Sequence, residues 1–235
     1  MNLLLFSPLD LADEGQLIIR DQRLDHLRNV LRASPGDSVR VGELGGLKGR
    51  AEIREMDSKQ ARLAYHLDTP PPAKLPLEII LALPRPKMLR RILRTVAECG
   101  VPRLHLINSY RVEKSFWQTP ALADAAVRGY LIQGLEQAQD TVLPEVHCHR
   151  GFKPFVEDAL PAMLEGKRAL LAHPGAEPPC PRDLDRATVL LIGPEGGFIP
   201  YEIERLEAAG CEPVTLGPRI LRVETALTAL LGRLA

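Results

Sequence analysis

The chain has 235 residues, enough to bury a substantial core as one large domain or two small ones. Hydrophobic residues make up 45% and charged residues 26%, as in ordinary globular proteins, and no apolar run approaches the length of a membrane span. The 30 basic and 30 acidic side chains cancel, which excludes nucleic-acid binding through overall charge and leaves only local basic patches for that role.

The N-terminal part of the chain is predicted to be a small β-rich unit that one helix interrupts. The helix is expected over residues 21–32, and short apolar or alternating runs indicate strands at residues 39–41, 51–53 and 61–65. The apolar side of the helix is expected to be buried through Leu24, Leu27, Val30 and Leu31. The polar residues of the same helix, left nearer to solvent, are His26, Arg28 and Arg32.

A proline-rich stretch ends this unit. Four prolines fall within residues 70–76, and they disfavour both a helix and an interior strand. The sequence therefore predicts an N-terminal domain at residues 1–69, a stiff linker at residues 70–76 and a second domain at residues 77–235.

The second domain is predicted to alternate strands and helices. A helix opens at Pro86 and runs to about residue 98, and a longer one is expected over residues 120–140. This alternation favours an α/β fold with a mostly parallel sheet and helices on both faces. The expected strands are residues 77–83, 104–107, 143–146, 169–172, 189–192 and 213–216.

Two glycine-bearing loops near the C-terminus are the most informative motifs. Residues 192–198 and 216–222 each follow a strand and lead into a helical pattern. Such loops meet at the carboxyl ends of neighbouring parallel strands, where α/β proteins bind ligands. Glycine allows close backbone approach, so we expect a nucleotide-type pocket. The alternative is a tight strand-to-helix turn in which Glu195 is merely solvated or supports the start of a helix.

The order of these motifs resembles the SPOUT methyltransferases, and specifically the 16S rRNA uridine-N3 methyltransferase family. The segments that carry the resemblance are residues 193–198 and 216–226, residues 26–32 with Gly36 and Asp37, and the pair Glu136 and Gln137.

The chain departs from the family pattern in three places. The family usually begins with Arg residues, whereas residues 1–6 contain none. An Arg commonly follows the Glu-Gln pair, where this chain has residues 138–140 as Ala, Gln and Asp. Val223 stands where the family usually has Thr. These departures suggest a divergent branch that could modify a different nucleotide.

The resemblance implies a C-terminal SPOUT-type domain whose end threads through a loop as a trefoil knot, and an N-terminal PUA-like β-barrel that docks RNA. It also implies a homodimer that methylates one uridine of 16S rRNA in the assembled small ribosomal subunit. The cofactor is S-adenosylmethionine, with no metal required. The residues that we expect to bind it are Ala172, Ile192, Gly193, Glu195, Gly196, Leu216, Gly217, Ile220, Leu221 and Thr225.

Methylation of uracil at N3 requires loss of the N3 proton, and the negative charge spreads onto O2 and O4. A cation near these oxygens would stabilise that charge, and Arg222 is the catalytic candidate. Glu224 could accept a proton or hold Arg222 in place, and both roles remain open. The alternative is an ordinary ion pair between the two at a helix N-terminus. Thr225 could instead cap or pack the helix.

Candidate RNA contacts form two basic clusters, one on each predicted domain. A basic face can bind phosphates even on a neutral protein, although an ordinary solvated helix face is the alternative for any single residue. The first cluster is His26, Arg28 and Arg32. The second is Arg85, Lys87, Arg90, Arg91 and Arg94.

Two further features each allow more than one role. His147 and His149 are expected to share one face of a strand, in surface or packing roles. The loop at residues 110–117 carries the only Trp of the chain and could stack a base, clamp RNA, cover the core or contact a dimer partner. Four cysteines without a CxxC pair argue against disulfides and a zinc site, and fit a cytoplasmic protein without a membrane partner.

Two other functions stay open from the sequence. The protein could methylate another rRNA or tRNA nucleotide with the same cofactor. It could also be a non-catalytic RNA-binding factor in ribosome assembly, although the intact glycine loops argue against this.

Overall fold

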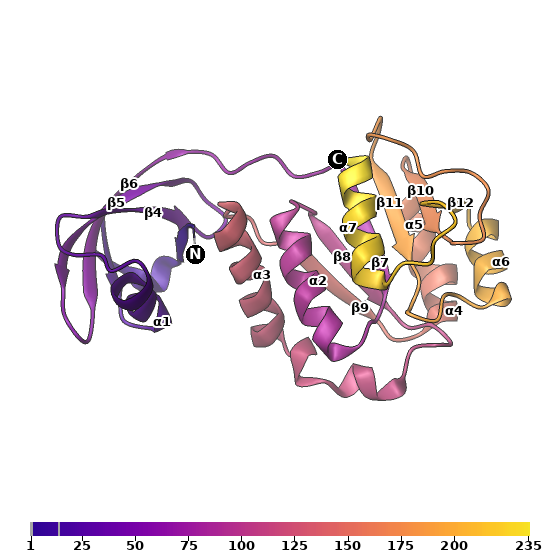
Figure 1. The fold of residues 1–235 in the computed structure, drawn as a ribbon, viewed down its shortest axis with the longest axis horizontal. Helices are drawn as coiled ribbons and strands as arrows, with labels where there is room; N and C mark the ends of the chain where they lie inside the picture. Colours follow the sequence, from indigo (N-terminus) through magenta and orange to yellow (C-terminus); the bar gives the residue numbers. More distant parts are fainter. Residues whose placement is uncertain (1, 14) are drawn as a thin grey trace. The chain divides into compact units, whose positions relative to one another are not determined.

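The computed structural model describes residues 2–13 and 15–235, which form two compact units (Figure 1). The first unit comprises Met1–Ala73 and Leu131–Leu143, and the second comprises Lys74–Tyr130 and Pro144–Ala235. Residues 70–76 form neither helix nor strand, as their prolines predict. The domain limits drawn from the sequence stay a prediction.

The first unit is built on one sheet ordered β1-β4-β5-β6-β3-β2. β1 pairs with β4 in parallel, and the other neighbours are antiparallel. The three strands expected from the sequence are confirmed as β4 to β6 and are longer than predicted, whereas β1 to β3 were not predicted. The strands are β1 (Leu4–Phe6), β2 (Leu11–Asp13), β3 (Gln16–Ile19), β4 (Ser38–Glu43), β5 (Lys48–Met56) and β6 (Ala61–Thr69).

The predicted N-terminal helix is present but irregular. It begins as α1 (Gln22–Asp25) and continues as a π-helical turn over His26–Val30, in which the Leu31 N–H donates to the His26 carbonyl at 3.0 Å. Leu24 and Leu27 are buried as expected. The expected burial of Val30 and Leu31 is wrong, because these side chains are 65% and 46% exposed. The wider turn advances less per residue around the axis, so the regular α-helical spacing no longer points them at the core.

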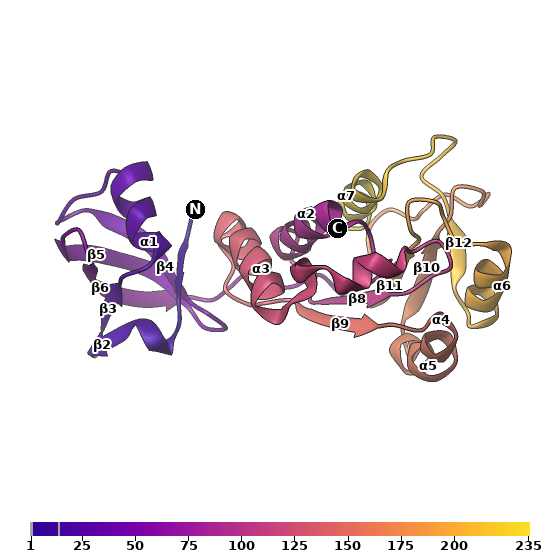
Figure 2. The same ribbon diagram turned by 90° about the horizontal axis from the view of Figure 1, so that it is seen from below.

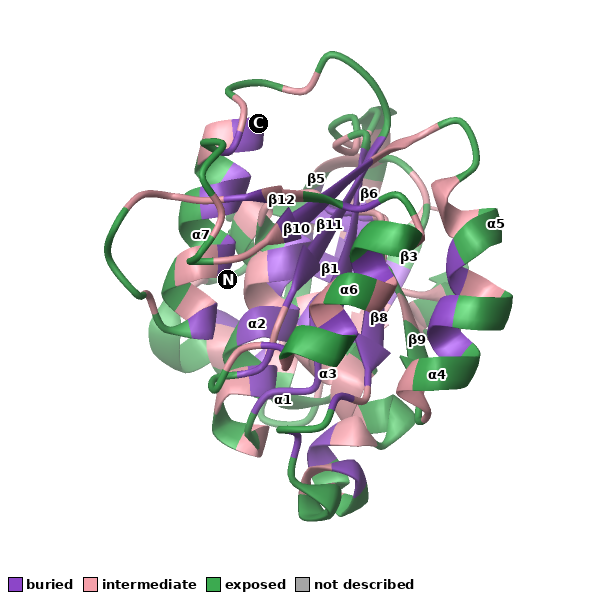
Figure 3. Ribbon diagram, turned by 90° about the vertical axis from the view of Figure 1, so that its right-hand side faces the viewer, coloured by how far each residue is buried: buried purple, intermediate pink, exposed green. Residues whose placement is uncertain are grey.

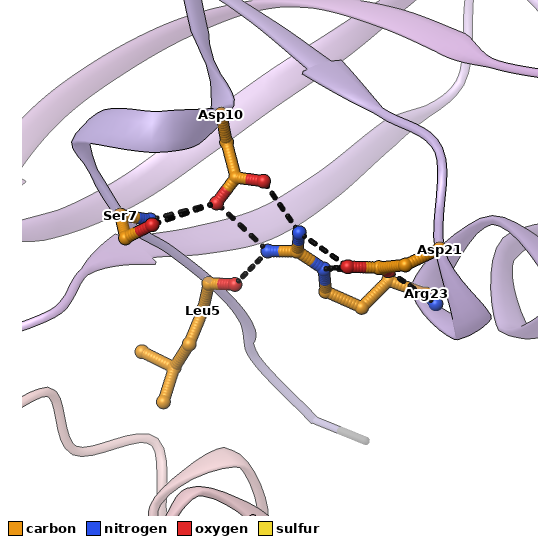
Figure 4. A network of polar contacts seen from close by, with 5 residues as sticks. All are labelled: Leu5, Ser7, Asp10, Asp21 and Arg23. Atoms are coloured by element: carbon orange, nitrogen blue, oxygen red, sulfur yellow. Dashed lines mark hydrogen bonds and ion pairs between the residues drawn. The ribbon is translucent and has the colours of Figure 1, made fainter. Parts of the chain in front are cut away.

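Arg23 ties the start of this helix to the first strand of the sheet (Figure 4). Its guanidinium donates to the Leu5 carbonyl at 2.7 Å and to the Asp21 carboxylate at 2.7 Å, and it also pairs with Asp10. Asp10 in turn accepts from the Ser7 N–H at 2.8 Å. The guanidinium is mostly buried, so these acceptors satisfy donors that would otherwise lack water.

The second unit contains a wholly parallel sheet ordered β12-β10-β11-β7-β8-β9, which confirms the α/β expectation. Every residue of β7 and β11 is buried, as continuous apolar runs predict. β9 begins two residues later than expected, after Pro144. The strands are β7 (Leu77–Ala82), β8 (Arg103–Ile107), β9 (Glu145–His149), β10 (Arg168–Ala172), β11 (Thr188–Ile192) and β12 (Glu212–Val214).

Helices cover both faces of this sheet. α2 and α7 lie on one face and α4 and α5 on the other (Figure 2). The central strands β7 and β11 are buried, whereas the edge strand β9 is largely exposed (Figure 3). No helix in the described ranges is long and apolar enough to cross a bilayer. The helices are α2 (Pro86–Glu98), α3 (Asp124–Ala138), α4 (Phe152–Pro154), α5 (Leu160–Leu164), α6 (Pro200–Ala208) and α7 (Val223–Leu234). Shorter helical turns are Pro8–Asp10, Lys114–Gln118, Pro120–Leu122 and Phe155–Ala159.

Three histidines cluster on one face of β8 and β9. The buried His105 ring stacks on His147 with 5.0 Å between centroids, and its Nδ1 lies 3.3 Å from Nε2 of His149. His147 and His149 therefore share a face, as predicted. Burial and the two neighbouring imidazoles lower the pKa of His105 to about 4, although Glu78 opposes the shift. Among the described residues, no cluster of His, Cys, Asp and Glu could hold a metal ion.

This cluster predicts a loss of stability in mild acid. The unfolded chain binds a proton at residue 105 near pH 6.5 and the folded chain only near pH 4. Stability should therefore be fully present above pH 6.5 and fall as the pH drops through this window, by about 3 kcal/mol. Urea unfolding between pH 4 and pH 7.5 measures this slope. His105→Phe should flatten the slope, and the exposed-site control His66→Asn should not; equal slopes in all three proteins would contradict the assignment.

Candidate functional site

A pocket of about 370 Å³ lies where three parallel strands of the second unit end. β10 lies between β11 and β12, and Ala172 at its end pairs with Ile192 on one side and Val214 on the other. The two glycine loops therefore do not follow directly neighbouring strands, and that detail of the expectation is wrong. The loop after β10 supplies the middle of the wall, through His173 and Pro174.

The structure brings most of the residues predicted to bind a cofactor into this pocket. Thr225 is the exception, because it is exposed on α7 and is not part of the lining. The predicted residues that do line the pocket are Ala172, Ile192, Gly193, Glu195, Gly196, Leu216, Gly217, Ile220 and Leu221.

Several lining residues were not identified from the sequence. Helix α7 contributes an apolar wall, and its helical spacing could have indicated it. Arg111 reaches the pocket from the loop at residues 110–117, which was not expected to line it, and no local pattern marks Arg111 as a pocket residue. Phe198 and Arg219 belong to the two loops expected to form the pocket, although they were not named as cofactor ligands. The residues outside these loops that sequence reasoning missed include Arg111, His173, Val214, Val223, Ala226 and Leu230.

The glycine loops have backbone shapes that other residues would strain. Gly217 has φ +110°, and its N–H donates to Thr215 Oγ1 at 3.1 Å. Gly197 has φ +74° in the first loop. At Gly193, an added Cβ would lie 3.1 Å from the Phe198 ring. Backbone geometry therefore favours glycine in both loops, and close packing favours it at Gly193 as well.

The proposed catalytic pair lies beside the pocket. Arg222 is exposed and directly precedes α7, and Glu224 is half-buried in the first turn of that helix. Neither is part of the pocket lining. Among the described contacts no ion pair joins them, so the simple ion-pair alternative has no support in the structure.

The basic cluster of the second unit reaches the first glycine loop. The Glu195 carboxylate accepts from both the backbone N–H and Nε of Arg85, each at 3.3 Å. The guanidinium carbon (Cζ) of Arg94 lies 4.9 Å from the centre of the Tyr130 ring. The exposed members of the cluster are Arg85, Lys87, Arg90 and Arg91.

The basic cluster of the first unit is partly buried. Arg28 and Arg32 are exposed, and Arg32 has the left-handed φ of 52° at the end of the helical segment. His26 is half-buried and its Nε2 has no hydrogen-bond partner. Burial lowers the pKa of His26, so this imidazole is a weaker cation than an exposed histidine.

The structure gives the three departures local roles. Asn2 Nδ2 donates to the Gln137 carbonyl at 3.0 Å, and its backbone N–H donates to Glu136 at 3.1 Å. Asp140 is buried and its Oδ1 accepts from the backbone N–H groups of the next two residues. The departures at residues 1–6 and 138–140 thus both lie in the first unit. Val223 lies in the second unit, where it lines the pocket.

Comparison with known proteins shows the family. A family model described as "RNA methyltransferase domain" matches residues 71–235, and one described as "RNA methyltransferase PUA domain" matches residues 19–64. A curated relative from Treponema pallidum, named ribosomal RNA small subunit methyltransferase E, is 30% identical over 97% of this chain and 88% of its own. A Synechocystis relative of the same name is 28% identical over 94% and 73%.

Solved structures share this fold. Ribosomal RNA small subunit methyltransferase E from Neisseria gonorrhoeae, bound to S-adenosyl methionine, has a TM-score of 0.75 at 24% identity, covering 97% of this chain and 95% of that one. A methyltransferase structure from Legionella pneumophila with its bound cofactor has a TM-score of 0.73 at 23% identity, with the same coverage. The chain therefore belongs to the RNA methyltransferase family whose relatives over nearly the full length are named ribosomal RNA small subunit methyltransferase E.

Proposed function

We propose that this protein transfers the methyl group of S-adenosylmethionine to N3 of one uridine in 16S rRNA of the small ribosomal subunit. The observation that carries the proposal is the pocket at the aligned ends of β10, β11 and β12, in a chain of this family. The relatives' shared name supplies the substrate class, and the Neisseria gonorrhoeae structure supplies the cofactor.

The pocket fits the proposed cofactor by its chemistry. Leu216, Ile220 and Leu221 offer apolar surface for an adenine, and the glycine backbones of both loops can approach its polar edge. S-adenosylmethionine supplies a methyl group on a sulfonium, so the transfer leaves a neutral thioether and the C–S electron pair on sulfur. The protein's own task is to align N3 with that methyl group and to stabilise the charge left by the N3 proton.

The remaining assignments rest on the resemblance. Arg222 is proposed to stabilise the charge on the uracil carbonyls, and Glu224 to accept a proton or hold Arg222. Thr225 is proposed to support the cofactor from the rim. The two basic clusters are proposed to bind RNA phosphates. The protein is proposed to act as a cytoplasmic homodimer. Its domains are proposed to be residues 1–69 and 77–235, joined by a linker at residues 70–76.

The first prediction concerns the product. Purified protein, labelled S-adenosylmethionine and small subunits from a strain lacking this gene should yield 3-methyluridine in 16S rRNA, as read by nucleoside mass spectrometry. Label in another nucleoside would show that the enzyme methylates a nucleotide other than a uridine at N3. Cofactor binding without transfer to subunits, free rRNA or tRNA would instead favour an assembly role.

The second prediction concerns the second glycine loop. Gly217→Ala places a Cβ at φ +110°, where the loop must distort, so the Kd for S-adenosylmethionine should rise at least about tenfold. Gly210→Ala is the matched control, because Gly210 has φ +97° and, like Gly217, has open space around its Cβ position, but does not line the pocket. Calorimetry measures both Kd values; an equal rise in the two variants would refute a local role for Gly217.

The third prediction concerns Arg222. Because this side chain lies outside the pocket lining, Arg222→Ala should leave the Kd for S-adenosylmethionine within a few-fold. Its kcat should fall on the order of 100-fold if the guanidinium stabilises the developing charge. Single-turnover methylation of small subunits measures the rate, and normal turnover would remove Arg222 from the catalytic role.

A further inference from the structure

Arg111 lies in the wall of the cofactor pocket although it belongs to a distant segment of the chain. It follows β8, and its Nη1 donates to the Gly196 carbonyl in the first glycine loop. A Cβ at Gly196 would lie only 2.9 Å from Cδ of Arg111. The glycine at this position therefore makes room for the stem of the arginine, and the two loops are fitted to each other.

A buried carboxylate bonds both to the loop that carries Arg111 and to the end of the first glycine loop. Glu202, on α6, is 2% exposed. Its Oε1 accepts from the Tyr110 N–H at 2.7 Å, and its Oε2 accepts from the Ile199 N–H at 3.0 Å. One oxygen thus holds the residue before Arg111, and the other holds the end of the glycine loop. Losing either bond would leave a backbone N–H unsatisfied.

The far end of the Arg111 loop is also anchored. Trp117 is buried, and its Nε1 donates to Asn108 Oδ1 at 2.9 Å. The Arg150 guanidinium lies 5.3 Å from the centre of the Trp117 ring. The loop that carries Arg111 is therefore held at both ends, and the only Trp of the chain serves as its anchor.

Arg111 differs from the other arginines near the pocket. Arg85 is engaged by Glu195, and Arg222 lies outside the lining. Arg219 lines the pocket, but among the described contacts no hydrogen bond or ion pair holds its guanidinium. Arg111 has no acidic partner among the described ion pairs, and it is exposed with most of its five N–H donors unspent. The Arg111 guanidinium is thus held by the Gly196 carbonyl and still has N–H donors with which to bind a ligand.

We propose that Arg111 is a catalytic residue that donates hydrogen bonds to a carbonyl oxygen of the target uracil, with Glu202 as the residue that positions it. The inference rests on the proposed function. Loss of the N3 proton to water leaves an anion whose charge lies on O2, O4 and N3. A guanidinium that is already oriented stabilises this anion without reorganising, and it acts before the N3 lone pair attacks the methyl carbon.

The experiment compares wild type, Arg111→Ala and Arg111→Lys in single-turnover methylation of small subunits from pH 6.5 to pH 9.5. Arg111→Ala should lower kcat on the order of 100-fold near pH 7. The deficit should shrink as the pH rises, because a uridine without the cation loses its N3 proton only at higher pH. Arg111→Lys should recover part of the rate. Lys114→Ala removes an exposed charge from the same loop and should change neither the rate nor the profile.

Several outcomes would overturn the assignment to Arg111. A normal rate in Arg111→Ala would do so, and so would a profile parallel to wild type at every pH, since a merely structural loss does not depend on uridine ionisation. A Kd for S-adenosylmethionine raised more than about tenfold, with kcat unchanged, would place Arg111 in cofactor binding instead. Failure of wild type to make 3-methyluridine would refute the proposed function itself, before any variant is compared.

Glu202→Gln tests the positioning role, because it keeps the shape and one acceptor but presents an amide N–H to one of the two backbone donors. Its kcat should fall about tenfold near pH 7, and this deficit should shrink as the pH rises, as for Arg111→Ala. The double variant should be no slower than Arg111→Ala alone, because Glu202 acts through Arg111. Additive losses, or a loss explained by a lower folded fraction in circular dichroism, would overturn this role.

Discussion

One register in the parallel sheet determines the geometry of the site. Because Ala172 pairs with both Ile192 and Val214, the strands β10, β11 and β12 end at the same level, and the three loops that follow them open onto one pocket. A slip of one residue in either pairing would turn every following side chain to the opposite face and separate the loops. The pairing of β10 with both of its neighbours is thus as necessary to the site as the residues that line it.

The second constraint is the buried carboxylate of Glu202, which joins parts of the chain that no strand pairing connects. It accepts from Tyr110 on one side and Ile199 on the other, so it sets where Arg111 stands against the glycine loop. The same logic operates in the first unit, where the Arg23 guanidinium joins β1 to the start of α1. In both units, one charged group with directional partners, buried at Glu202 and mostly buried at Arg23, joins elements that no strand pairing connects.

Local pattern predicted much of this molecule. The continuous apolar runs of β7 and β11 and the proline that opens α2 are visible in the sequence, and so are the glycine loops. The errors arose where position depends on non-local geometry. Val30 and Leu31 follow a π-helical turn that spacing cannot reveal, and β10 was not expected between β11 and β12 because strand order is set by packing. Arg111 was missed as a pocket residue for the same reason.

The pocket wall is assembled from segments far apart in the chain, and its last portion is the apolar face of α7 through Val223, Ala226 and Leu230. A chain that ended before this helix would keep both glycine loops and still lack one side of the site. Since the pocket exists only in the complete fold, a bound cofactor stabilises that fold by mass action, by about 2.7 kcal/mol at a hundredfold excess over its Kd. Cofactor binding therefore adds to the free energy of unfolding of the unit to which the C-terminal helix belongs.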